Sequence, residues 1–165
     1  MQFRDLGKQY GVLKEQIDFE IQKVLNKAEY IGGSPVVELE KQLASYVGVK
    51  HCIACANGTD ALQLALIAMG VKKGDAVFVP DFTFFASGEV VPLVGATPIF
   101  VDVNKSTYNI SIESLEKMIN LVLEEGKLIP KVIIAVDLFG QPAEFSAIKE
   151  IAQKYNMYIL EDGAQ

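Results

Sequence analysis

The alternation of short apolar runs with helix-like segments is the feature that most constrains how this chain folds. The apolar runs are continuous instead of alternating with polar residues, which is typical of strands covered on both faces. We expect strands at residues 51–56, 75–80, 97–103, 131–140 and 157–162. We expect helices between them at residues 59–70, 83–95, 111–126 and 143–156, the third of them capped by Ser111. The sequence therefore predicts an α/β fold whose mainly parallel sheet has helices on both faces.

Two further helices are expected before the first strand. Residues 10–27 carry apolar side chains at helical spacing, which predicts an amphipathic helix. A second helix follows, with Ser34 as its N-cap and Pro35 at its first position, where proline is well tolerated. This helix runs to about Val47 and stops at Gly48, since glycine commonly ends helices.

Composition and charge argue against several classes of protein. Of the 165 residues, 50% are hydrophobic, which suits a globular domain with a core. Lys and Arg number 15 and Asp and Glu 21, so the net charge is −6 and no basic block offers a nucleic-acid site. The apolar runs are shorter than the roughly 20 residues of a membrane span, and the N-terminus lacks the apolar region of a signal peptide. We therefore expect a cytoplasmic protein with no nucleic-acid or membrane partner.

Cys52 and Cys55 form a C-x-x-C pattern, which also occurs in redox pairs and zinc sites. A zinc site needs four ligands, whereas this chain has no second cysteine pair and one histidine, His51. In a strand, the two cysteines would point to opposite faces. We therefore interpret them as small apolar residues of a buried strand and expect no metal site.

Polar residues follow the expected strands, at the sheet edge where open α/β proteins bind ligands. In "ANGTDALQLAL", Gly58 permits a tight turn, and Thr59 and Asp60 then begin a helix whose first N–H groups have no internal partner. Such a helix start is a ready phosphate site. The pattern is neither a Walker loop nor a Rossmann fingerprint, and an ordinary N-cap is the alternative interpretation.

Two more strand-end positions add to this candidate site. Phe82, Phe84 and Phe85 follow a strand, where they either pack in the core or offer one ring to a planar ligand. Asp162 ends the last strand, where a buried carboxylate needs a cation or a donor. It either pairs with a protonated ring nitrogen or caps a following helix. A phosphate site, an aromatic platform and a strand-end carboxylate on one sheet edge together indicate a site for a phosphorylated pyridine such as pyridoxal phosphate.

The chain resembles the sugar aminotransferases of the DegT/StrS family, which use pyridoxal 5′-phosphate and have the aspartate-aminotransferase-like fold (fold type I). The similar segments follow in order along the whole chain: "CANGTDALQLAL", "VPDFTFFASGEVV", "PIFVDVNKSTYNI", "VDLFGQPAE" and "ILEDGAQ". The resemblance implies that residues 1–48 are an N-terminal helical segment of the large domain and that residues 49–165 begin its cofactor-binding α/β part. The stretch "EYIGGSPVVELEKQLASYVGVKHCIACANGTDALQ" looks most like the branch that aminates UDP-linked 3-keto-uronic acids.

The resemblance also implies roles for individual residues. Residues 58–60 would hold the phosphate, largely through backbone N–H groups. Phe84 would stack on the pyridine ring, at a position where family members often have Trp or Tyr. Asp162 would pair with the ring nitrogen, and Gln165 would hydrogen-bond the ring hydroxyl or stack near it.

The family's Schiff-base lysine lies beyond the segment that resembles "ILEDGAQ". We therefore expect that lysine beyond Gln165 and no catalytic residue within this chain. Lys127, Lys131, Lys149 and Lys154 do not occupy a matching position. The resemblance accordingly implies that the chain is the N-terminal part of a longer protein, with the rest of the large domain and the small domain outside it.

For the complete protein, the resemblance implies transfer of an amino group from glutamate to a keto nucleotide sugar, for surface polysaccharide or deoxysugar biosynthesis. It also implies a homodimer. Two alternatives stay open. One is a catalytically inactive module that binds a phosphorylated ligand, and the other is a sugar dehydratase of the same family in which histidine replaces the lysine.

Overall fold

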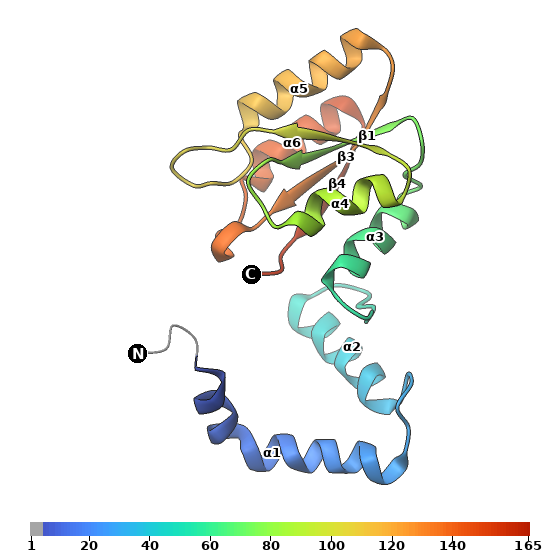
Figure 1. Cartoon of the computed structure of the whole chain (residues 1–165), viewed down its shortest axis with the longest axis vertical. Helices are drawn as coiled ribbons and strands as arrows, with labels where there is room; N and C mark the ends of the chain where they lie inside the picture. Colours follow the sequence, from blue (N-terminus) through green and yellow to red (C-terminus); the bar gives the residue numbers. More distant parts are fainter. Residues whose placement is uncertain (1–4) are drawn as a thin grey trace. The chain divides into compact units, whose positions relative to one another are not determined.

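The computed structural model describes residues 5–165, and the chain divides into two compact units (Figure 1). We call Met1–Ala54 the helical unit and Cys55–Gln165 the α/β unit. The sequence suggested a division at residue 48, and the assignment of both parts to one large domain stays a prediction. None of the helices in the described residues is long and apolar enough to cross a membrane.

The helical unit contains α1 (Leu6–Lys27) and α2 (Ser34–Val47). Asp5 caps α1, since its side chain accepts a hydrogen bond from the Lys8 N–H at 2.9 Å. The prediction that Ser34 caps α2 is wrong: Gly33 is the N-cap, because its carbonyl already accepts the first hydrogen bond of the helix. Gly48 ends α2 with a φ of 77°, as predicted. No described residue of either helix is buried.

Residues 51–56 form no strand, so that prediction is wrong. A strand satisfies its backbone groups on a neighbouring strand, whereas the Ala54 N–H donates to Glu40 Oε1 at 2.8 Å. The interpretation of the cysteines as buried-strand residues is also wrong, because Cys52 is half-buried and Cys55 is exposed, and neither is in a disulfide. Residues 5–165 contain no group of three or more His, Cys, Asp or Glu side chains that could hold a metal ion.

The α/β unit is built on a four-stranded parallel sheet in the order β2-β1-β3-β4. Its strands are β1 (Asp75–Pro80), β2 (Thr97–Val101), β3 (Ile129–Val136) and β4 (Tyr158–Asp162). The register pairs Phe78 of β1 with Ile133 of β3, and Val136 of β3 with Asp162 of β4. The predicted α/β fold with a mainly parallel sheet is therefore confirmed.

Helices cover both faces of the sheet (Figure 1). They are α3 (Gly58–Ala68), α4 (Phe85–Leu93), α5 (Ile112–Glu125) and α6 (Phe145–Tyr155), and a 3-10 turn, η1 (Leu138–Gly140), follows β3. Side chains alternate along β1, so that Val77 and Val79 pack with α3 and α4, and Ala76 and Phe78 pack with α5 and α6. Both cores are therefore filled from the same strand, as its continuous apolar run predicts. Ser111 caps α5 as predicted, accepting from the Ser114 N–H.

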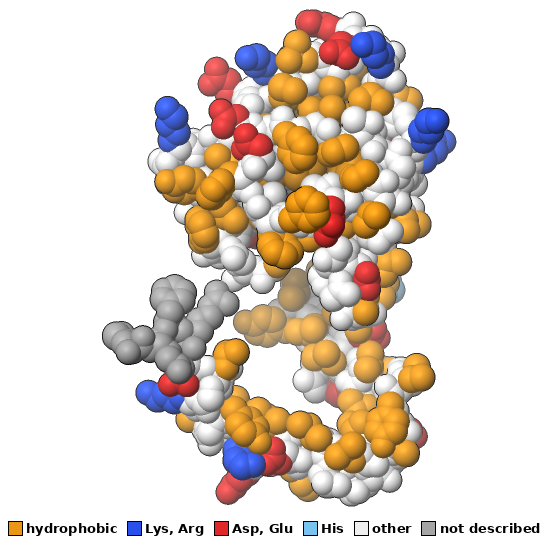
Figure 2. Space-filling view, in the orientation of Figure 1, with side chains coloured by type: hydrophobic (Ala, Val, Ile, Leu, Met, Phe, Trp, Pro, Cys, Tyr) orange, Lys and Arg blue, Asp and Glu red, His pale blue; other side chains and the backbone are white. Residues whose placement is uncertain are grey.

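The central and outer strands differ in burial. β1 and most of β3 are buried, as predicted, whereas Phe100 of β2 and Tyr158 of β4 are exposed. The prediction that every strand is covered on both faces is therefore wrong for β2 and β4, which lie at the margins of the described sheet. Figure 2 shows hydrophobic side chains gathered on the visible surface of the α/β unit.

Candidate functional site

A cavity of about 510 Å³ opens in the α/β unit at the carboxyl ends of β1, β3 and β4. Parallel strands end at the same edge of a sheet, so the loops that follow them converge there. The cavity wall includes five of the predicted site residues: Gly58, Thr59, Phe84, Asp162 and Gln165. Residues more than a hundred positions apart in the sequence therefore meet at one ligand-sized space.

The first turn of α3 forms one wall of the cavity. Asn57 is the N-cap of this helix, and its Oδ1 accepts a hydrogen bond from the Asp60 N–H at 2.9 Å. The N–H groups of Gly58 and Thr59, which line the cavity, have no hydrogen-bond partner within residues 5–165. Unpaired N–H groups at the positive end of a helix suit an anionic oxygen such as that of a phosphate.

Asp60 lies apart from the other predicted site residues. Its carboxylate accepts a hydrogen bond from Asn57 Nδ2 at 3.1 Å, and its N–H is already bound by the same side chain. It lines a separate hollow that includes Cys55 and Gln63. The helix start thus has an ordinary N-cap and two unpaired N–H groups at once. The N-cap is Asn57, which the sequence analysis missed although Asn before Gly is a typical cap.

Phe84 lines the cavity and is 75% exposed. It is the N-cap residue of α4, with extended backbone angles that carry the chain from the β1 loop into the helix. Phe82 also lines the cavity, and both it and Phe85 are exposed. The alternative that these three aromatic side chains are core residues is therefore wrong, because the loop after β1 lies outside both cores.

Asp162 is held in place by a buried hydroxyl on the neighbouring helix. Its Oδ2 accepts a hydrogen bond from Ser87 Oγ at 2.8 Å, and Ser87 is fully buried. Ser87 Oγ lies 3.1 Å from Thr83 Oγ1. Because the Ser87 hydrogen goes to Asp162, Thr83 is the donor in the second bond. The chain of hydroxyls from Thr83 to Ser87 fixes the orientation of a carboxylate that lines the cavity.

Sequence analysis did not identify Ser87. One signal was available, since Thr83 and Ser87 are four residues apart at the start of a predicted helix, where such residues lie on the same side. The partner, Asp162, is 75 positions further along the chain, so only the fold reveals the pair.

Gln165 completes the cavity wall next to the loop after β3. Its Oε1 accepts a hydrogen bond from the N–H of Phe139, which also lines the cavity. Gly140 approaches the same residue closely: a Cβ added there would lie 3.3 Å from the Gln165 carbonyl oxygen, and its φ is +81°. A side chain at position 140 would therefore be strained and would crowd Gln165.

Asp137 and Glu161 form a carboxyl pair at the edge of the cavity. Burial raises the pKa of Glu161, and the negative charge of Asp137 and the hydrogen bond that the protonated Glu161 donates to Asp137 raise it further, while Lys149 opposes the shift. Asp137 Oδ1 also accepts from the Ala143 N–H at 3.0 Å. Glu161 precedes Asp162 on β4, so its side chain points to the opposite face of the sheet. Asp137 therefore lines the cavity, whereas Glu161 lies outside its wall and acts on it through Asp137.

These features define a class of protein. An open helix N-terminus, an exposed aromatic ring, an oriented carboxylate and an amide surround one cavity at the carboxyl edge of a parallel sheet. The fold and the site suit an anionic, planar ligand bound at the sheet edge of an α/β protein.

The chain belongs to the DegT/DnrJ/EryC1/StrS aminotransferase family, whose sequence pattern matches residues 12–165. The resemblance that the motifs suggested is therefore confirmed. Over all 165 residues, the chain is 47% identical to the UDP-2-acetamido-2-deoxy-3-oxo-D-glucuronate aminotransferase of Pseudomonas aeruginosa. The match covers 100% of this chain and 44% of that relative, so the chain spans less than half the length of the relative.

Solved structures give the same result. A DegT DnrJ EryC1 StrS aminotransferase from Brucella abortus superposes with a TM-score of 0.98 at 51% identity, over 100% of this chain and 44% of that one. NtdA from Bacillus subtilis, solved with the bound cofactor PMP, superposes with a TM-score of 0.82 at 31% identity, over 90% of this chain and 32% of that one. The fold is thus an incomplete α/β fold of the pyridoxal-phosphate transferases, and aminotransferases of this family depend on that cofactor.

The residues of the cavity fit such a cofactor. The unpaired N–H groups of Gly58 and Thr59 suit a phosphate, and an added Cβ at Gly58 would meet no atom within 4 Å, so the space in front of this backbone is open. The oriented carboxylate of Asp162 suits a protonated ring nitrogen. The N–H groups and the carboxylate thus match the phosphate and the ring nitrogen of a phosphorylated pyridine.

Proposed function

We propose that the complete protein carrying this chain is a pyridoxal-5′-phosphate-dependent aminotransferase that moves an amino group from glutamate to a keto nucleotide sugar. The observation that carries the proposal is the cavity in which the α3 N-terminus and the Ser87-bound carboxylate of Asp162 lie together. Membership of the aminotransferase family supports the reaction class.

Within the proposal, each cavity residue has a separate task. The backbone N–H groups of Gly58 and Thr59 hold the phosphate. Phe84 covers one face of the pyridine ring, and Gln165 binds at the ring hydroxyl. Asp162 keeps the ring nitrogen protonated, with its own orientation set by Ser87. When bound, the cofactor supplies an electron sink for amino-group transfer.

The lysine that holds the cofactor covalently is proposed to come from outside this chain. Within residues 5–165, no lysine lines the cavity. The residues described here would then bind and orient the cofactor, while the remainder of the complete protein supplies the covalent bond. This division of tasks is consistent with a chain that spans 44% of its Pseudomonas relative.

The proposed acceptor is a UDP-linked 3-keto sugar. The Pseudomonas relative, 47% identical, is named for a 3-oxo-glucuronate, and a second relative, from Acidithiobacillus ferrooxidans and 42% identical, is named for a 3-dehydro-glucosamine. Both names describe UDP sugars oxidised at the third carbon, which favours that position for this protein.

The proposal also includes a cytoplasmic homodimer. Large apolar side chains are exposed in both units, including Val12 and Phe19 on α1 and Phe85 at the start of α4. Exposed apolar side chains in such numbers favour coverage by further protein surface. Sedimentation of the complete protein tests this part: a monomer at micromolar concentration would contradict it.

The reaction is tested with the complete protein, pyridoxal phosphate, glutamate and the 3-keto UDP sugar named for the Pseudomonas relative. We expect 2-oxoglutarate and an aminated nucleotide sugar in equal amounts, measured by mass spectrometry. A folded protein that binds the cofactor but aminates no keto nucleotide sugar would contradict the aminotransferase and favour a binding module. Loss of water from the sugar without amination would favour a dehydratase.

A further inference from the structure

Asn109 joins two loops at the ligand edge of the sheet. It lies between β2 and α5 and is 4% exposed. Its Nδ2 donates to the carbonyl oxygens of Gln141 and Pro142, both at 3.0 Å. These partners are 32 and 33 positions further along the chain, in the loop that follows β3. One buried amide therefore fixes the distance between the two loops.

The loop that Asn109 holds carries part of the cavity wall. Phe139 lies in this loop, lines the cavity, and donates its N–H to Gln165. The Gln141 N–H donates to the Leu138 carbonyl at 3.1 Å, which closes the loop on itself. A shift of the Gln141 carbonyl would therefore move Phe139, and with it the donor that holds Gln165.

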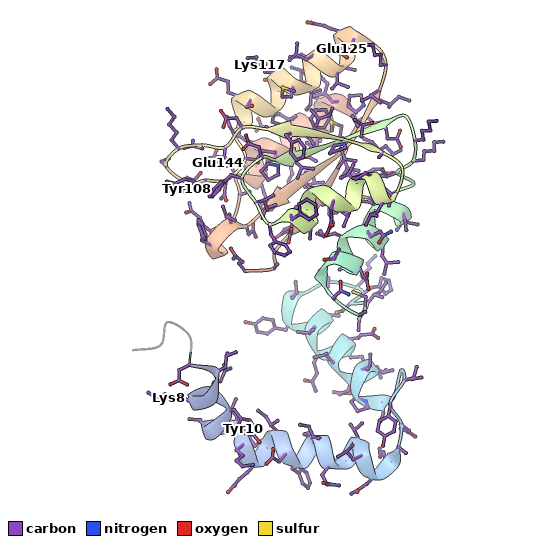
Figure 3. The ribbon with its side chains drawn as sticks, in the orientation of Figure 1. Lys8, Tyr10, Tyr108, Lys117, Glu125 and Glu144 are labelled. Atoms are coloured by element: carbon purple, nitrogen blue, oxygen red, sulfur yellow. The ribbon has the colours of Figure 1, made fainter. Side chains whose placement is uncertain are left out.

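Tyr108, the residue before Asn109, lies next to two aromatic side chains of the cavity wall. Tyr108 lies on the loop after β2 (Figure 3), and its ring centroid is 5.5 Å from that of Phe82 and 6.4 Å from that of Phe139. Its φ is +60°, a strained value for a residue with a large side chain. Strain of this kind persists only where the surroundings hold the backbone in place. The buried Asn109 side chain, one residue away, holds the backbone in place.

The orientation of the Asn109 amide follows from its partners. Both neighbours are carbonyl oxygens, which only accept, so the nitrogen must face them. Its Oδ1 is buried without a partner among residues 5–165. Burying an unpaired acceptor costs stability. The stabilising contribution of this side chain therefore comes from its amide nitrogen and the two hydrogen bonds that the nitrogen donates.

We infer that Asn109 is a positioning residue of the cofactor cavity, which places Phe139 and Gln165 against the ring end of the cofactor by holding the loop after β3. This inference rests on the proposed function. The phosphate end of the cavity is built differently, from the α3 turn capped by Asn57, and does not pass through Asn109. Asn109 should therefore affect contacts with the ring and leave contacts with the phosphate unchanged.

The test uses Asn109→Asp in the complete protein, since this near-isosteric change replaces the donor with an oxygen that repels both carbonyls. Asn120→Asp is the matched control, because Asn120 on α5 accepts a hydrogen bond from the Tyr155 hydroxyl on α6, and an aspartate retains that role. Pyridoxamine 5′-phosphate, which binds without a covalent bond, is titrated by calorimetry. Inorganic phosphate is then measured as its competitor.

For Asn109→Asp, we expect the dissociation constant of pyridoxamine 5′-phosphate to rise at least about fivefold, as for the loss of a hydrogen bond or more. The inhibition constant of inorganic phosphate should stay within about twofold, and Asn120→Asp should change neither. Asn109→Ser, which keeps one donor, should give an intermediate constant and serves if the aspartate variant does not fold.

Three results would overturn the inference. Unchanged binding of pyridoxamine 5′-phosphate would show that the loop is held without Asn109. Equal weakening of both ligands, or failure of both variants to fold, would assign Asn109 to the fold alone. If the unmodified protein binds no pyridoxamine 5′-phosphate, the proposed function itself fails, which is a separate outcome.

Discussion

Ser87 donates a hydrogen bond of 2.8 Å to Asp162 across 75 positions of sequence, from the buried face of α4 to the end of β4. Bonds between a hydroxyl and an ionised acceptor are among the stronger hydrogen bonds in proteins. The pair connects the helix that begins at the aromatic loop with the strand that carries the carboxylate.

Asp162→Asn in the complete protein removes the charge that is proposed to keep the ring nitrogen protonated. We expect kcat to fall by a factor on the order of a hundred or more, because the ring becomes a poorer electron sink. Binding of inorganic phosphate should persist. Stopped-flow and steady-state assays check the rate, with Asp102→Asn as control, since Asp102 is exposed and caps the local turn at Val103. Normal turnover by a folded variant would reject the role of Asp162.

Ser87→Ala leaves the Asp162 charge but removes its donor. The carboxylate can then rotate, and we expect kcat/KM to fall about tenfold, as for a lost hydrogen bond to a charged group. Ser106→Ala is the control, because Ser106 bonds only to Asn104 in an exposed turn. If Ser87→Ala and Ser106→Ala have equal kcat/KM, then Asp162 is oriented by other contacts.

Asn57→Ala removes the cap of α3 and should cost about 1 kcal/mol of stability. It should also weaken binding of pyridoxamine 5′-phosphate, because the capped turn presents the Gly58 and Thr59 N–H groups. Ser111→Ala removes the corresponding cap of α5, away from the cavity. We expect equal losses in denaturant titrations and weaker ligand binding for Asn57→Ala alone. Equal binding by the two variants would contradict a phosphate site at α3.

Glu161→Gln should stabilise the protein at pH 7. The pKa of Glu161 is raised above its ordinary value of 4.5, first by burial and then by Asp137. The folded state therefore binds the proton more tightly than the unfolded state, so this group lowers stability as pH rises from 4.5 through its folded pKa. Glu161 is exposed to solvent, which keeps the effect small. Melting temperatures at pH 4 and pH 7 check this: the gain should be present at pH 7 and absent at pH 4.

The central sheet could be predicted from sequence because its signals are local. Continuous apolar runs gave the positions of β1 and of most of β3, and Ser111 gave the start of α5. The strand predicted at residues 131–140 is wrong beyond Val136, because Leu138–Gly140 form a 3-10 turn. The strand prediction failed where the segment has no neighbouring strand to pair with. Residues 51–56 have the composition of a strand but no neighbouring strand among the described residues, and the Ala54 N–H bonds to a side chain instead.

The sequence predicted where most residues of the candidate site lie, but not the contacts that hold them in place. Strand ends pointed to Phe84 and Asp162, and a helix start pointed to Gly58 and Thr59. Sequence cannot show which side chains turn into a cavity, so Asp60 was included although Asn57 binds both its N–H and its carboxylate. Supporting contacts such as that of Asn109 join segments distant in sequence, and no local pattern marks them.

The sheet order places β4 next to β3, so that the cavity lacks the Asp162 carboxylate until β4 has paired. During synthesis, the helix that begins at Gly58 leaves the ribosome long before Asp162 does. A ligand that needs both ends of the cavity cannot assist the early steps of folding, and it stabilises only molecules whose sheet already includes β4. Cofactor binding in the cell would therefore favour chains whose sheet already includes β4 over chains arrested before Leu160.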